Sequence, residues 1–305
     1  MLHFVRANPR RLVWVGFWVL IACNRFAAAE AVEFQLQPAG GNVHMLSGQG
    51  GNIGVCVGED GVFLIDDQFA PLTQQILAEI RKLSEAPVRF VLNTHWHGDH
   101  TGGNENLGEA GAIIVAHANV RRRMSEKQFM EAFDRTVEPA PKGALPVVTF
   151  DQSINFHWNG EAIEVVHVPP AHTDGDSVVY FGNANVIHAG DLFFNGTYPY
   201  IDTGAGGNLA GMIQGVERIL ERSDGKTRII PGHGPLGMRA DLERYHTMLT
   251  SVRDRVAPMV REGRSRDEVI AAKPTADFDA DWGGGFMQPD VWVGLVYDGF
   301  QPKAR

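Results

Sequence analysis

The sequence has little cysteine, no excess of positive charge and no long hydrophobic segment, and each absence excludes a class of protein. Its 305 residues contain 2 cysteines, Cys23 and Cys56, which excludes a small disulfide-bonded scaffold. Lysine and arginine number 27 against 36 acidic residues, and this formal net charge of −9 argues against nucleic acid as a partner. The apolar run Leu12–Cys23 is too short to span a bilayer comfortably.

The first 29 residues are typical of a signal peptide. Three arginines precede the apolar run, and Ala27–Ala29 supply the small residues that signal peptidase requires. Two alternatives stay open, an N-terminal anchor helix and a lipoprotein signal that would leave Cys23 as the lipidated N-terminus. All three predict a periplasmic or secreted protein with no other membrane contact. Removal of residues 1–29, with their four arginines and no acidic residue, moves the formal net charge from −9 to −13.

Alternating apolar runs and amphipathic segments predict an α/β protein. A strand at 62–65, a helix beginning at Pro71 and a strand at 88–92 follow the order of a sheet covered by helices. Other predicted strands lie at 32–37, 42–47, 52–57, 112–115, 186–191 and 228–230, with a second, antiparallel sheet at 147–150, 154–158, 162–168 and 177–181. Helices are predicted at 120–133, at 209–220 and over most of the last seventy residues. We predict one catalytic domain, residues 30–236, with a C-terminal helical extension, residues 237–305, packed on it.

The densest cluster of metal-binding side chains is the segment Thr94–His100. Three imidazoles and a carboxylate within six residues suit neither a hydrophobic core nor a charged surface, whereas zinc binds both donor types. His95 and His97 stand two residues apart at a strand end, where side chains alternate, so both point the same way. Asp99 and His100 follow as the chain turns toward a second point. This segment therefore predicts a metal site.

Other donors also lie at the ends of apolar runs, namely His172, Asp191 and His233. Tyr198 and Tyr200 follow on a loop rich in glycine and proline. They are candidates to line a substrate cleft or to donate a hydrogen bond to a developing oxyanion, and packing on the core is the alternative.

Together these motifs resemble the metallo-β-lactamase superfamily over roughly residues 40–235. The resemblance implies a four-layer αβ/βα sandwich with a dimetal site along one edge. Asp66 follows the strand at 62–65, and the resemblance implies that it supports the metal ligands without binding the metal itself. The ligand sets that the resemblance implies are His95, His97 and His172 for one zinc ion, Asp99, His100 and His233 for a second, and Asp191 as the bridge between them.

This resemblance implies a zinc-dependent hydrolase in which two Zn²⁺ ions activate a hydroxide to attack a carbonyl of a small-molecule substrate. Asp99 is the expected catalytic residue, which orients the hydroxide and carries its proton. Export favours a β-lactamase-like role, although a bridging Asp191 is more typical of thioesterases and lactonases. Three alternatives stay open: a thioesterase of the hydroxyacylglutathione hydrolase type, a persulfide dioxygenase with one Fe²⁺ on His95, His172 and Asp191, and a non-catalytic periplasmic zinc-binding or relay protein.

Overall fold

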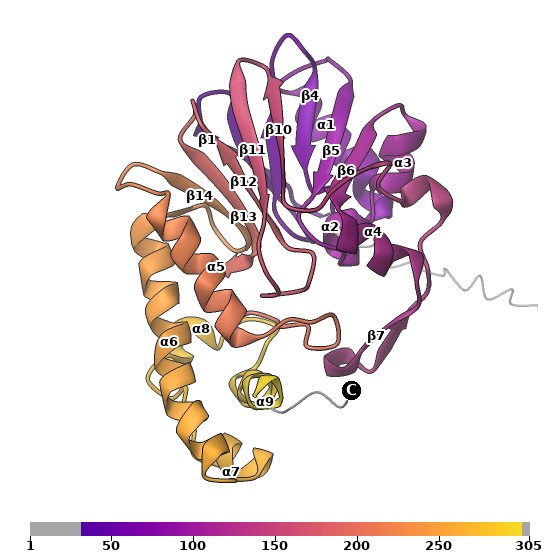
Figure 1. Ribbon diagram of the computed structural model, residues 1–305. Helices are drawn as coiled ribbons and strands as arrows, with labels where there is room; N and C mark the ends of the chain where they lie inside the picture. Colours follow the sequence, from indigo (N-terminus) through magenta and orange to yellow (C-terminus); the bar gives the residue numbers. More distant parts are fainter. Residues whose placement is uncertain (1–31, 301–305) are drawn as a thin grey trace, which may run out of the picture. The chain divides into compact units, whose positions relative to one another are not determined.

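The computed structural model describes residues 32–300 of the chain (Figure 1). The predicted signal peptide, including Cys23, lies outside the described residues. Within residues 32–300, no helix combines the length and the apolar composition needed to cross a membrane.

Within this described range, one sheet has seven strands, and its parallel half delivers the Thr94–His100 segment. From β4 onward its strands are parallel, and the strands before β4 are antiparallel. The spatial order of the sheet is β1 (Gln35–Gly40), β2 (Val43–Ser47), β3 (Ile53–Cys56), β4 (Val62–Ile65), β5 (Val88–Asn93), β6 (Ile113–His117) and β9 (Val148–Phe150). β4 and β5 are short, buried apolar strands, as their sequences predict.

The second sheet, described over residues 153–238, has six strands. Its first four strands are antiparallel, β13 and β14 are parallel, and β15 returns antiparallel to β14. The order is β10 (Ser153–Trp158), β11 (Glu161–His167), β12 (Ser177–Phe181), β13 (Val186–Phe194), β14 (Arg228–His233) and β15 (Gly237–Met238).

The two sheets pack face to face, and helices cover their outer faces (Figure 1). Phe63 and Leu92 of the first sheet share a buried apolar core with Val179 and Ile230 of the second. Helices on the first side are η1 (Ala70–Leu72), α1 (Thr73–Arg81), α2 (Gly98–Thr101), α3 (Asn104–Glu109), α4 (Ala118–Ser125) and η3 (Lys142–Ala144). The predicted α/β fold with four layers is therefore correct.

The helices on the second side include the C-terminal part of the chain. They are α5 (Leu209–Glu221), α6 (Arg239–Arg261), α7 (Arg266–Ala271), α8 (Asp279–Trp282) and α9 (Pro289–Gly299). α5 and α6 lie against β13, and their apolar faces share a core with α9. The predicted boundary between a domain at 30–236 and an extension at 237–305 stays a prediction.

The helix predicted over 120–133 is wrong in its second half. α4 ends at Ser125, and a hairpin of β7 (Gln128–Met130) and β8 (Arg135–Val137) follows, with η2 (Glu131–Phe133) between the strands. Helix-forming residues fill this segment, but the Gln128 amide donates to the Arg123 carbonyl oxygen and ends the helix. Asp134 then turns the chain with a positive φ of 45°.

The strand predicted at 147–150 belongs to the other sheet. β9 pairs in parallel with β6 of the first sheet, whereas β10, β11 and β12 form the predicted antiparallel set. A run of three or four apolar residues carries no information about its partner strand, so the sequence could not decide this pairing.

Candidate metal centre

The ends of strands from both sheets meet at one edge of the sandwich. The segment after β5 carries His95 and His97, and the loop between β11 and β12 carries His172. Asp191 lies within β13, and His233 ends β14. The carboxylate of Asp176 accepts the backbone N–H groups of His172 and Thr173 at 2.7 and 2.8 Å, which fixes the loop that presents His172.

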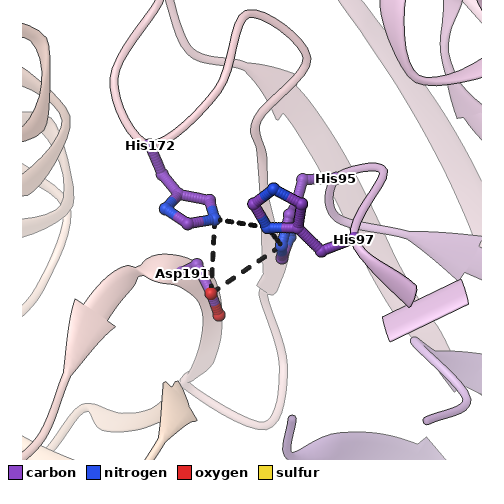
Figure 2. A group of neighbouring side chains, drawn as sticks. All are labelled: His95, His97, His172 and Asp191. Carbon is purple, nitrogen blue, oxygen red and sulfur yellow. Dashed lines mark hydrogen bonds and ion pairs between the residues drawn. The ribbon is translucent and has the colours of Figure 1, made fainter. Parts of the chain in front are cut away.

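His95, His97, His172 and Asp191 form a buried cluster, shown in Figure 2. We call the three imidazoles the three-histidine group. His97 Nδ1 lies 3.1 Å from His95 Nε2 and 2.9 Å from His172 Nε2. Asp191 Oδ2 lies 3.7 Å from His95 Nε2 and 3.3 Å from His172 Nε2.

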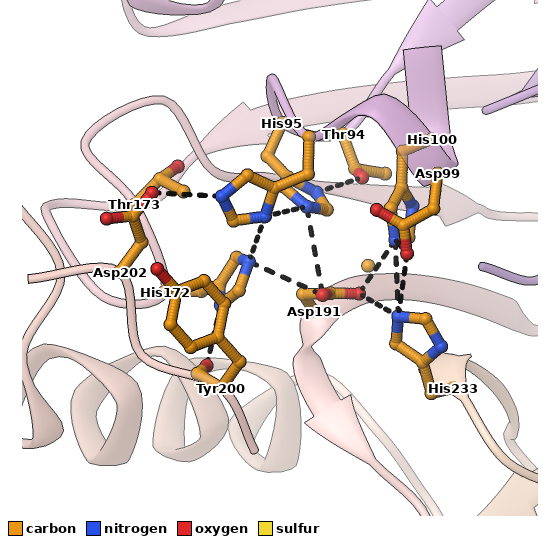
Figure 3. A network of polar contacts seen from close by, with 12 residues as sticks. Thr94, His95, Asp99, His100, His172, Thr173, Asp191, Tyr200, Asp202 and His233 are labelled. Atoms are coloured by element: carbon orange, nitrogen blue, oxygen red, sulfur yellow. Dashed lines mark hydrogen bonds and ion pairs between the residues drawn. The ribbon is translucent and has the colours of Figure 1, made fainter. Parts of the chain in front are cut away.

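Asp99, His100 and His233 form a second cluster, which we call the second group. Asp99 Oδ2 lies 3.5 Å from His100 Nε2 and 3.4 Å from His233 Nε2. Asp191 Oδ1 lies 3.1 Å from His100 Nε2 and 3.5 Å from His233 Nε2. One oxygen of Asp191 thus faces each group, as Figure 3 shows.

Hydrogen bonds behind the three-histidine group decide which nitrogen of each ring is free. Thr94 Oγ1 donates to Asp66 Oδ2 and can then only accept from His95 Nδ1, at 3.0 Å. His172 Nδ1 donates to the Tyr200 carbonyl oxygen at 2.8 Å. His97 Nε2 donates to Asp202 Oδ2 at 2.9 Å.

Each of the three rings therefore turns an unprotonated nitrogen toward the other two. Lone pairs that face one another at 2.9–3.1 Å repel unless a cation lies between them. Nitrogen ligands at about 2.0–2.1 Å from a tetrahedral zinc ion stand about 3.3 Å apart, close to these separations. The donor set and its geometry fit a zinc ion held by His95, His97 and His172.

Burial keeps His95 and His172 neutral. It lowers the pKa of His172 to about 4, and it lowers the pKa of His95 well below the usual value, an effect to which the nearby His100 adds. Neutral imidazoles are the form that binds metal.

In the second group, nearby carboxylates raise the pKa of the imidazoles instead. Burial alone would lower the pKa of His233, but Asp191 and hydrogen bonds with Asp191 and Asp99 raise it to about 9. Asp191 and Asp99 likewise outweigh burial and raise the pKa of His100. In the metal-free protein these rings therefore carry protons at neutral pH, which a cation would displace.

Asp66 and Asp202 act as positioning residues for the two groups. Asp66 accepts from Thr94 N–H at 2.7 Å and from His100 Nδ1–H at 2.8 Å, and its φ of 64° is strained for a non-glycine residue. Sequence reasoning selected Asp66 and missed Asp202. No local signal marks Asp202, because its partner His97 lies 105 positions earlier in the chain.

Two glycines allow the strands to approach the ligands closely. A Cβ atom on Gly232 would clash with Asp191 Oδ1, and one on Gly51 would clash with the His100 ring. Both positions therefore require glycine if Asp191 and His100 are to keep their places.

The two candidate cleft tyrosines have different positions. Tyr200 lies at the site, with its ring 5.6 Å from that of His97. Tyr198 is fully buried, stacks on Trp292 at 4.4 Å and donates its hydroxyl to Asp279 at 2.8 Å. Tyr198 thus packs among the C-terminal helices, which was the alternative considered for both residues.

Comparisons with known proteins point to one superfamily. The sequence profile of the Metallo-beta-lactamase superfamily matches residues 46–233, more than half of the chain. A type 2 metallo-beta-lactamase of Bacillus cereus is 25% identical over 190 residues, which cover 62% of this chain and 68% of that protein. A hydroxyacylglutathione hydrolase of Gloeobacter violaceus is 28% identical over 180 residues, 56% of this chain and 59% of that protein, less than two thirds of the relative's length. The fold is similar to that of a metallo-beta-lactamase from Pontibacter korlensis, with a TM-score of 0.59, 21% identity and coverage of 72% of this chain and 99% of that one.

Proposed function

The chain belongs to the metallo-beta-lactamase superfamily, and from this membership and the site geometry we propose that it is a dizinc hydrolase of carbonyl compounds. The observation that carries the proposal is the position of Asp191, with one carboxylate oxygen toward each histidine cluster. His95, His97 and His172 would hold one ion, Asp99, His100 and His233 the other, and Asp191 both. Two zinc ions, when bound, lower the pKa of a water shared between them and polarise the substrate carbonyl.

Asp99 is the side chain placed to move a proton. Burial alone would raise its pKa, but His100 and His233 outweigh burial and hold the pKa of Asp99 below its usual value. The Asp99 side chain is 29% exposed and lines a cavity beside His97. An ionised carboxylate in this position can orient a water molecule, accept its proton and return that proton to the leaving group.

The donor atoms of the second group point toward one another, which supports two metal ions rather than a single iron. A mononuclear site on His95, His172 and Asp191 would leave Asp99, His100 and His233 without a role, although their donor atoms lie within 4.8 Å of one another. Relatives named as a metallo-beta-lactamase and a hydroxyacylglutathione hydrolase support hydrolysis as the reaction class.

We propose that this reaction takes place in the periplasm or outside the cell, on the strength of the predicted signal peptide. Mass spectrometry of the mature N-terminus in the producing cell should find a chain that begins near Glu30, or a lipidated Cys23. An intact Met1 would contradict export by a cleaved signal.

Metal analysis joined to a substrate screen tests the proposal. Protein reconstituted with zinc should contain two zinc ions per chain and hydrolyse at least one of nitrocefin, a lactone, an ester and a thioester. His97→Ala should abolish that activity with an unchanged circular dichroism spectrum. His246→Ala, which removes a histidine on α6 that pairs with Glu217, is the matched control and should keep full activity. Full activity in His97→Ala, or one iron per chain with oxygen uptake, would overturn the proposal.

A further inference from the structure

An apolar cavity of about 680 Å³ opens beside His97 and Asp99. Trp96, Phe69 and Met124, the last from α4, are among its apolar lining residues. The volume lies within the range of pockets that bury most of a drug-sized ligand. Because His97 and Asp99 belong to both the cavity wall and the candidate metal centre, a molecule in the cavity would also reach the reactive carbonyl position.

The hairpin of β7 and β8 supplies the outer wall of this cavity through Met130, Phe133 and Val137. The Phe133 ring lies 4.9 Å from that of Tyr200, which in turn contacts His97. Phe133 is 43% exposed. This large apolar side chain, left in water beside a reactive centre, is available to contact a ligand.

Apolar side chains make up most of the cavity wall. Its charged residues are Asp99, Glu105, Arg123, Arg135 and Glu138, and two of them are paired with groups outside the cavity. Arg123 binds the Asp174 carboxylate at 2.9 Å, and Glu138 pairs with Lys127 at 2.8 Å. Recognition in the cavity therefore depends mainly on its apolar wall.

The surface beside His233 is different. A second cavity, of about 480 Å³, lies beside His233 and is lined by the polar, uncharged side chains of Gln35, Gln37 and Gln49. The apolar cavity thus borders His97 and Asp99, and the polar cavity borders His233.

We infer that the substrate is an acyl compound with an apolar acyl chain, which occupies the hairpin cavity, and a polar leaving group, which lies toward His233. This inference rests on the proposed function. In the reaction of an ester, water adds to the carbonyl carbon and the bond from that carbon to the leaving oxygen breaks. The acid keeps the apolar chain, and the alcohol departs with the proton that Asp99 transfers. The β7–β8 hairpin is then the element that determines acyl specificity.

A series of p-nitrophenyl esters with one leaving group and acyl chains from acetate to hexanoate tests the inference on the zinc-loaded protein. We expect kcat/KM to rise about fourfold per added methylene, the fold-change equivalent to about 0.8 kcal/mol for each CH₂ removed from water. Ala140→Trp places an indole in the cavity and should lower the ratio of hexanoate to acetate kcat/KM at least tenfold. Phe133→Ala should lower this ratio about threefold. Phe129→Ala is the matched control, since Phe129 lies on the same hairpin but outside the cavity wall, and it should leave the ratio unchanged.

Binding of the neutral fluorophore N-phenyl-1-naphthylamine to the same zinc-loaded proteins gives a readout that needs no turnover. We expect equal binding by wild type and Phe129→Ala, and at least fivefold weaker binding by Ala140→Trp. If this pattern appears but no acyl compound is hydrolysed, the apolar ligand site stands and the proposed hydrolase function fails. If esters are hydrolysed with no dependence on chain length and Ala140→Trp changes neither the ratio nor fluorophore binding, the function stands and the inference is overturned.

Discussion

The three-histidine group and the second group share Asp191 but differ in burial and in charge. Every ring of the three-histidine group is backed by a hydrogen-bond acceptor and buried, so its free nitrogens point inward without protons. In the second group the side chains of Asp99 and His233 are 29% and 24% exposed, and carboxylates keep its imidazoles protonated. One group is ready for a cation, whereas the other must first release protons.

This difference indicates that the two groups have different roles, one in tight metal binding and the other in proton transfer. A rigid, neutral cluster suits tight metal binding, because no proton has to leave and no ring has to turn. The more exposed second group contains Asp99, the residue that we propose moves protons, and exchange of protons with water requires access. Imidazoles within a few ångströms of each other thus acquire different chemistry from their surroundings.

Removal of the shared residue should have the largest effect. Asp191→Asn keeps the size of the side chain but removes the charge that both groups share. We expect a loss of activity of at least about 10³-fold, because the ions supply several kcal/mol of transition-state stabilisation. Mass spectrometry of metal content together with kcat/KM measures this. Full zinc content and activity in the variant would show that the groups act independently of Asp191.

Loss of one histidine from each group should give unequal results. His172→Ala should leave little bound zinc and lower kcat/KM on the order of 10³-fold, since the neutral cluster is the stronger site. His233→Ala should keep one zinc per chain and lose about 10²-fold, because only the second group is damaged. Titration with zinc in the presence of a chelating indicator resolves the two affinities. Equal losses in the two variants would contradict the division between the groups.

Loss of either positioning carboxylate, Asp202 or Asp66, should weaken zinc binding only at the group that it supports. Asp202→Asn weakens the support behind His97, and Asp66→Asn weakens the support behind His100. Loss of such a partner lowers metal affinity about 10- to 100-fold. We expect Asp202→Asn to weaken the tighter zinc site and Asp66→Asn the weaker one, as measured by stepwise zinc titration. If either variant changed the zinc affinity of both sites equally, Asp202 and Asp66 would not each support one group.

The number of protons released when zinc binds should differ between the two groups, which is the smallest effect expected. Because the pKa of His233 is raised to about 9 and that of His100 is also raised, both rings are protonated at pH 7. Zinc binding at the second group should release about two protons there, and its affinity should rise with pH at least up to the His233 pKa of about 9. At the three-histidine group, His95 and His172 should release none, since the pKa of His172 lies at about 4 and that of His95 is also lowered. Titration calorimetry in buffers of different ionisation enthalpy counts these protons, and equal release in both steps would contradict the charge assignment.

Local sequence was sufficient to predict most strands and to select the seven side chains that the structure gathers in the candidate metal centre. Each of these donors follows or ends an apolar run, and a strand end is recognisable from the residues around it. The bounds predicted for β4 are those observed, and the strands predicted for β5 and β13 begin at the observed residue and end one and three residues early. The hairpin at 128–137 was not predicted, because a side-chain bond and a turn at Asp134 overrode good helix formers.

The sequence by itself thus determined which donor atoms the protein has and which strands present them. Only the tertiary structure decided which ring nitrogen of each histidine is free, that Asp202 supports His97, and that Tyr198 belongs to the C-terminal core. It also decided that a hairpin closes an apolar cavity beside the metal centre. The physical reason is that donor type and strand propensity depend on near neighbours, whereas hydrogen-bond partners and burial depend on how two sheets from distant parts of the chain pack together.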